Sequence, residues 1–215
     1  PNASIREGML INLSQGVDPN LQEEFYSQVI ASAINLGKKY RFDENHSRHV
    51  TALALNLFDA LLTMHGMDRR ARLLLEVAGL LHDVGMFIRS SGHHKHSQYI
   101  LANSEIFGLY QEDLDVISNV VRYHRKAPPN ATHIAFIALQ REDRILVLKL
   151  AAILRVADAL DRGHAQRIKD IKVEQREDAI LITVMGSHDL TLERLGLEEK
   201  SDMFQDVFGY KVILL

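Results

Sequence analysis

The chain has 215 residues, of which 47% are apolar, so it is long enough for one large domain or one domain with a smaller unit attached. It has no cysteine, which excludes disulfides and thiolate metal sites. The formal net charge of −3 argues against nucleic acid as a partner, and no apolar run approaches a membrane span. The start has no signal-like pattern, which favours a cytoplasmic protein.

The pattern of apolar residues predicts that the first 165 residues are almost wholly helical. Asp18-Pro19 is typical of a helix start, and Asp43 and Asp68 are predicted N-caps of the next two helices. The helix that follows Asp68 is expected to carry His82 and Asp83 in its last turn. Helices are expected over residues 20–36, 44–65, 69–84, 95–103, 111–125, 132–138 and 143–160, with a polar loop over 88–94.

The hydrophobic period changes after residue 165. Residues 168–173 and 179–184 are rich in β-branched side chains and are predicted to form a hairpin. A helix over 191–208 and a strand over 211–215 follow. The predicted fold is therefore mainly α, with a helical bundle over 18–165 and a small α/β unit (β-β-α-β) over 166–215.

The doublet His82-Asp83 lies in an otherwise apolar run between Ala78 and Phe87. Burying a carboxylate beside an imidazole is costly unless something pairs with it. Because imidazole and carboxylate are both metal ligands, a bound cation would resolve the conflict. The alternative is a satisfied core histidine beside a salt-bridged aspartate.

Two more residues can join the doublet in one metal site. His46 lies in the first turn of its capped helix, and Asp158 lies near the end of the helix over 143–160. Histidine and carboxylate ligands together suit zinc, manganese, iron or magnesium. The alternatives are a solvated His46 and an Asp158 that pairs with Arg155 or Arg162.

In order and spacing, these four residues resemble the H…HD…D signature of the HD-domain superfamily of metal-dependent phosphohydrolases. The resemblance implies that His46, His82, Asp83 and Asp158 bind a divalent metal ion, and that the substrate is a phosphoester or phosphoanhydride.

His96 and His124 resemble the extra ligands of HD proteins that hold two metals. In this hypothesis Asp83 or a neighbouring carboxylate orients the attacking water, while His124, Arg125 and Lys126 hold the phosphate, with Arg155 or Lys149 as further candidates. The other histidines are not assigned to the site. His49 is interpreted as a neighbour of it, and His65, His164 and His188 as residues without a role. His93, His94 and His133 are interpreted as loop or surface residues, with His94 the first candidate for an exception.

A closer resemblance covers more of the chain. Residues 92–101 and 121–126 are similar to the C-terminal region of the exopolyphosphatase/guanosine pentaphosphate phosphatase family, and residues 4–10 resemble the segment that closes the preceding phosphatase domain of that family, an actin-like ATPase fold. The resemblance implies that this chain is the back part of a longer protein. Residues 1–17 would then be the tail of that upstream domain or a linker.

Two functions from different classes follow from these observations. The first is a metal-dependent phosphohydrolase module that acts on a nucleotide or on polyphosphate. The second is a non-catalytic module with a structural metal, which binds polyphosphate or serves a regulatory role. The partners would be a phosphorylated small molecule or polyphosphate, the upstream domain, and, through exposed strand edges, a second copy of the chain.

Overall fold

The computed structural model describes residues 19–185 and 189–215, so the predicted tail over 1–17, the cap Asp18 and His188 lie outside the described residues. The described chain is mostly helical, with one small sheet. The helices are α2 (Pro19–Lys39), α3 (Glu44–Ala60), α4 (Leu62–His65), α5 (Arg69–Leu81), the 3-10 helix η1 (Val84–Phe87), α6 (His93–Ala102), α7 (Gln111–Arg122), α8 (Ile134–Ile137), α9 (Arg141–Ala159), α10 (Thr191–Lys200) and α11 (Asp202–Phe208). The strands are β1 (Ile171–Gln175), β2 (Ala179–Val184) and β3 (Lys211–Leu214). No helix in these two ranges is long and apolar enough to cross a membrane.

The predicted caps of α3 and α5 are confirmed. The side chain of Asp43 accepts a hydrogen bond from the backbone N–H of His46 at 3.1 Å, and that of Asp68 accepts one from Ala71 at 2.9 Å. The cap at Asp43 therefore sets where α3 begins and places His46 in its first turn.

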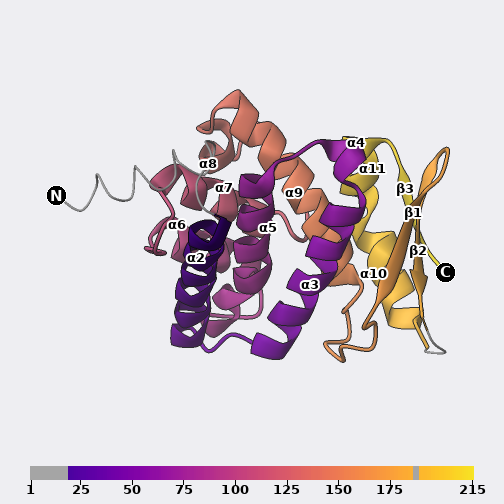
Figure 1. Cartoon of the computed structure of the whole chain (residues 1–215), viewed down its shortest axis with the longest axis horizontal. Helices are drawn as coiled ribbons and strands as arrows, with labels where there is room; N and C mark the ends of the chain where they lie inside the picture. Colours follow the sequence, from indigo (N-terminus) through magenta and orange to yellow (C-terminus); the bar gives the residue numbers. More distant parts are fainter. Residues whose placement is uncertain (1–18, 186–188) are drawn as a thin grey trace.

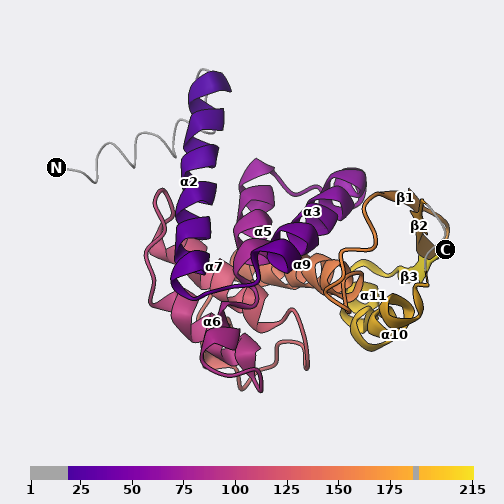
Figure 2. The same cartoon turned by 90° about the horizontal axis from the view of Figure 1, so that it is seen from below.

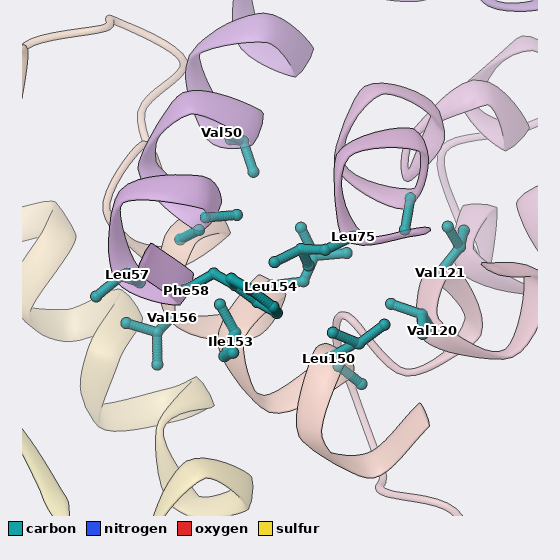
Figure 3. Close-up of a cluster of buried hydrophobic side chains, with 14 of the residues drawn as sticks. Val50, Leu57, Phe58, Leu75, Val120, Val121, Leu150, Ile153, Leu154 and Val156 are labelled. Carbon is teal, nitrogen blue, oxygen red and sulfur yellow. The ribbon is translucent and has the colours of Figure 1, made fainter. Parts of the chain in front are cut away.

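Helix α9 lies at the centre of the helical body and packs against α3, α5 and α7. Figure 3 shows aliphatic side chains of these four helices meeting, among them Val50, Leu75, Val121 and Leu150, and each of these four is fully buried. Burying a side chain of this size stabilises the fold by about 1.5–3 kcal/mol. This packing fixes the relative positions of α3, α5, α7 and α9.

The C-terminal unit has the three predicted strands, with two helices in place of the single predicted one before the last strand. Strand β2 pairs antiparallel with β1 and parallel with β3, and the sheet order is β1-β2-β3. The single helix expected over 191–208 is in fact two, α10 and α11, which meet at Ser201. Both pack against α9. Figures 1 and 2 show this unit at one end of the molecule, with α2 and α6 toward the other.

Three predicted helix boundaries near the histidines differ from the structure. Helix α5 ends at Leu81, so His82 and Asp83 lie in the turn between α5 and η1 and not in a last helical turn. Helix α6 begins at His93, two residues earlier than predicted, because Gly92 adopts the left-handed conformation (φ 74°) that allows the chain to turn into a helix there. Helix α7 ends at Arg122, so His124 follows the helix. Each shift changes which side chains can meet.

Candidate metal centre

The structure brings three predicted ligands together in what we call the inner group: His46, His82 and Asp158. Nε2 of His46 lies 3.3 Å from Nε2 of His82 and 3.7 Å from Oδ1 of Asp158. Neighbouring ligands of a tetrahedral or octahedral ion lie about 3.0–3.4 Å apart when the bonds are about 2.1 Å long. The two imidazoles thus have the spacing of ligands that share one ion.

The inner group is assembled by the core helices. His46 comes from the first turn of α3, His82 from the residue after α5, and Asp158 from the last turn of α9. Both histidine side chains are fully buried and Asp158 is 7% exposed. Contacts between α3, α5 and α9 place the ends of these helices near one another, and the three side chains converge there.

Asp83 belongs to a second set, which we call the outer group: Asp83, His93 and His124. It also forms a possible set with His46 and the exposed His164, a residue to which the sequence assigned no role. Oδ1 of Asp83 lies 3.0 Å from Nε2 of His93 and 3.6 Å from Nε2 of His124. Its other oxygen, Oδ2, lies 3.7 Å from Nε2 of His82 and 4.0 Å from Nε2 of His46. Asp83 therefore faces both groups, one oxygen toward each, as a carboxylate that bridges two ions would.

The interpretation of His93 as a loop or surface residue is wrong, since its side chain is only 5% exposed and lies in the outer group. The early start of α6 places it there. His96, which was predicted to extend the site, belongs to none of the ligand groups found among the described residues. It lies one turn further along α6, where its Cβ packs against Gly85: a Cβ added to Gly85 would come within 2.8 Å of it. The histidine of α6 that faces the aspartate is therefore His93.

All four histidines of the two groups present the same ring nitrogen to the centre. Nδ1 of His82, His93 and His124 lies 2.7–2.9 Å from a backbone carbonyl oxygen, and Nδ1 of His46 lies 2.8 Å from Oδ2 of Asp161. In each neutral ring Nδ1 is then the donor, which leaves the lone pair on Nε2. Histidines that bind metals are oriented in this way by their outer hydrogen bonds.

The centre contains a buried polar atom without a partner. Oδ1 of Asp83 makes no hydrogen bond within the described chain, although two imidazole nitrogens lie close to it. A carboxylate oxygen that faces two nitrogen lone pairs is unfavourable without a cation between them. The donor set, four imidazole nitrogens and two carboxylates without thiolate, fits zinc, manganese, iron or magnesium.

The ionisable groups of the centre shift one another's pKa values. Burial raises the pKa of Asp83, but the positive charge of the nearby imidazoles in their protonated state, first that of His82, outweighs burial and holds this pKa well below its usual range. Burial lowers the pKa of His124 to about 3. The two groups therefore hold ionised carboxylates and at least one neutral imidazole at neutral pH, the protonation states that bind metals.

Asp158 does not pair with Arg155 or Arg162, the partners considered from the sequence. Its Oδ2 forms a buried ion pair with Lys200, the last residue of α10. Burial raises the pKa of Asp158, but the ammonium group of Lys200 outweighs it and lowers that pKa. A cation from the C-terminal unit thus reaches the inner group.

Asp161 is a residue of the candidate site that the sequence reasoning missed. Its side chain is 1% exposed, and its two oxygens accept hydrogen bonds from the backbone N–H of Gln166 at 2.8 Å and the side chain of Gln166 at 3.2 Å, besides the contact with His46. A carboxylate that orients a ligating histidine is a usual part of a metal site. The sequence offers one signal for Asp161: it lies three residues after Asp158, a distance of about one helical turn.

A cavity of about 300 Å³ opens beside the two groups, and Asp83, His93, His124 and Asp158 form part of its wall. The same wall carries three permanent cations, Arg125, Arg162 and Lys200. Arg125 was predicted to hold phosphate, and the structure places it at this cavity. The combination of ligating side chains and surrounding positive charge suits a phosphorylated molecule.

Lys126, the other predicted phosphate-holding residue, does not line this cavity. It lines a second hollow of about 370 Å³ together with His94, Lys95, Arg122 and His133, and no residue of its wall is acidic. The further candidates Arg155 and Lys149 are engaged elsewhere: Arg155 donates to the backbone oxygens of Lys200 and Lys126, and Lys149 donates to that of His65.

Comparison with known proteins gives a consistent result. Residues 30–201 match the family model described as Ppx/GppA phosphatase, domain III. Among curated relatives named guanosine-5'-triphosphate,3'-diphosphate pyrophosphatase, that of Pseudoalteromonas translucida is 25% identical over 187 residues (82% of this chain, 35% of the relative). That of Aeromonas hydrophila is 26% identical over 204 residues (91% and 39%), and that of Aliivibrio fischeri 23% identical over 216 residues (98% and 41%). The chain thus spans less than half the length of these relatives.

Proposed function

The chain belongs to the Ppx/GppA phosphatase domain III family, and we propose that its helical body is a divalent-metal-dependent phosphohydrolase centre of the HD type. The observation that carries this proposal is the convergence of four Nε2 lone pairs and two carboxylates beside a cavity with a cationic wall. His46, His82 and Asp158 would hold one ion, His93 and His124 a second, and Asp83 both. Bound ions would supply Lewis acidity at a phosphoryl oxygen and make water a competent nucleophile near neutral pH.

The chain's own residues would orient the substrate. Arg125 and Arg162 lie on the cavity wall with Asp83 and His93, so their guanidinium groups can pair with phosphate oxygens while the scissile group faces the ligands. Permanent cations in a partly closed cavity also offset the charge that develops on the transferred phosphoryl group.

The proposed substrate carries several phosphate groups. The relatives are named for guanosine-5'-triphosphate,3'-diphosphate, a nucleotide with five phosphate groups. The second basic hollow supports a substrate of this kind, because two pairs of consecutive residues connect it to the cavity. His93 and Arg125 line the cavity, and their neighbours His94 and Lys126 line the second hollow. A chain of phosphates, in a nucleotide or in polyphosphate, could reach from one hollow to the other.

The test is phosphate release by the 215-residue chain supplied with Mn²⁺ or Zn²⁺, on a panel of nucleotides and polyphosphate. Asp83→Asn, which keeps the size of the side chain, should lower metal-dependent release by at least about a hundredfold. Asp59→Asn is the matched control, because Asp59 pairs with Arg72 on the surface and lines neither hollow. Equal release by Asp83→Asn and the parent chain would exclude this function.

A second candidate is a module in which the metal is structural. The edge strands β1 and β3, which can pair with another chain, support it. In that case metal should raise the melting temperature strongly, and no substrate of the panel should release phosphate. Turnover that depends on the metal and on Asp83 would decide for the enzyme.

A further inference from the structure

Lys200 is the one cation of the cavity wall that is buried, with 6% of its surface exposed. It comes from the C-terminal α/β unit, whereas the candidate ligands all come from the helical body. Its ammonium group contacts Oδ2 of Asp158. On the other side of the carboxylate, Oδ1 of Asp158 lies 3.7 Å from Nε2 of His46 and 4.0 Å from Nε2 of His82.

The backbone of Lys200 is held firmly by Arg155, which is itself 1% exposed. Nε of Arg155 donates to the carbonyl oxygen of Lys200 at 2.9 Å, and its two terminal nitrogens donate to the carbonyl oxygen of Lys126 at 2.7 Å and to Oδ1 of Asp202 at 2.9 Å. Arg155 therefore ties the junction of α10 and α11 to α9 and to the segment after α7. The ammonium group, by contrast, sits on a four-carbon stem beside an open cavity.

A divalent ion at the inner group and an ammonium group on the same carboxylate would repel each other. Both need the negative charge of Asp158, and both lie where the surrounding protein screens charges less than water does. An ion bound between His46, His82 and Asp158 therefore weakens the contact that keeps Lys200 on Oδ2. The nearest place where the displaced ammonium can be solvated or paired is the cavity that it already lines.

We propose that Lys200 is an exchangeable partner of Asp158, which neutralises the carboxylate in the metal-free protein and turns into the cavity toward a substrate phosphate when a divalent ion binds. The C-terminal unit would thereby set the metal affinity of a centre built by the helical body. The part about phosphate rests on the function proposed above, whereas the competition with the ion at Asp158 does not.

The first experiment measures Mn²⁺ binding by calorimetry on the full 215-residue chain. Lys200→Met keeps the length of the stem and removes the charge. We expect it to bind Mn²⁺ about tenfold more tightly than the parent chain, because the ion no longer displaces an ammonium group. Lys149→Met is the control, since Lys149 is a half-buried lysine of α9 that donates to the carbonyl oxygen of His65 away from both hollows. Its affinity for Mn²⁺ should equal that of the parent.

The direction of the change separates competition from a merely structural role. If Lys200 only positions α10, its replacement disturbs the site and Mn²⁺ affinity stays equal or falls, which would overturn the proposal. Lys200→Gln, which can still donate a hydrogen bond to Asp158 without a charge, is the second variant, and it should also bind more tightly than the parent. If Lys200→Met folds only with Mn²⁺ present, Lys200→Gln decides the matter alone.

A second measurement tests the substrate contact. The substrate is the member of the panel from which the parent chain releases phosphate. At saturating Mn²⁺, Lys200→Met should raise KM for this substrate about tenfold or more, and Lys200→Arg should restore part of the loss. An unchanged KM would overturn the contact with phosphate. If the parent chain itself releases no phosphate, the proposed function fails, while the calorimetry still decides whether Lys200 competes with the ion.

Discussion

The inner and outer ligand groups differ in how the fold supports them. His46 and His82 are fully buried and do not line the cavity, whereas His93 and His124 form part of its wall. Side chains that the core encloses have little freedom to move, and side chains that line a cavity have more. The inner group is thus suited to retain an ion, and the outer group to exchange ligands with a substrate.

The largest effect is expected from His82→Ala. This substitution removes an inner ligand and leaves a buried space next to Gly79, so it should lower the free energy of unfolding by about 3 kcal/mol and abolish turnover. Urea unfolding with and without Mn²⁺ measures the stability, and elemental analysis measures the bound metal. A variant that keeps its full metal content would show that the inner group does not bind the ion.

An intermediate effect is expected from His93→Ala. Because His93 belongs only to the outer group, the variant should lose one ion and most of its activity, while its melting temperature without metal changes by less than that of His82→Ala. His96→Ala is the matched control on the same helix and should keep both ions. The opposite ranking, with His96 needed and His93 dispensable, would contradict the structure at α6.

The smallest effect is expected on the stability of the protein at acidic pH, through His94, which lies next to the outer group. His94 is buried, its Nδ1 has no hydrogen bond within the described chain, and burial, followed by Arg122 and other cations, lowers its pKa to about 4. Because the folded pKa lies below the unfolded value of about 6.5, the unfolded chain binds the proton first, so stability is lost as the pH falls from 6.5 toward 4.

The His94→Gln variant should not show this loss of stability, because glutamine does not bind a proton in this pH range. Melting temperatures of the metal-free chain should therefore fall less between pH 6.5 and 4.5 in the variant than in the parent, by about 2–4 °C. Parallel curves for the two proteins would show that His94 does not titrate in this window.

The comparison of the two groups also shows what could be predicted. His46, His82, Asp83 and Asp158 were found because each has a local signal: a cap at Asp43 three residues before His46, an apolar run around the doublet, and a long amphipathic helix that ends near Asp158. His93 was missed and His96 chosen because the start of α6 depends on the left-handed backbone at Gly92, and a shift of two residues changes which side chain faces Asp83.

By itself, the sequence determined the mainly helical body, the hairpin, helical segment and last strand of the C-terminal unit, and the residue types that could hold a metal without cysteine. Local rules suffice for these, because caps, hydrophobic period and composition act over a few residues. Only the tertiary structure decided which histidine joins Asp83, that Asp161 orients His46, and that Lys200 neutralises Asp158. Most of these contacts join residues 31 or more apart in the chain, and the packing of α9 against α3, α10 and α11 brings such residues together. The choice of His93 depends instead on where α6 begins.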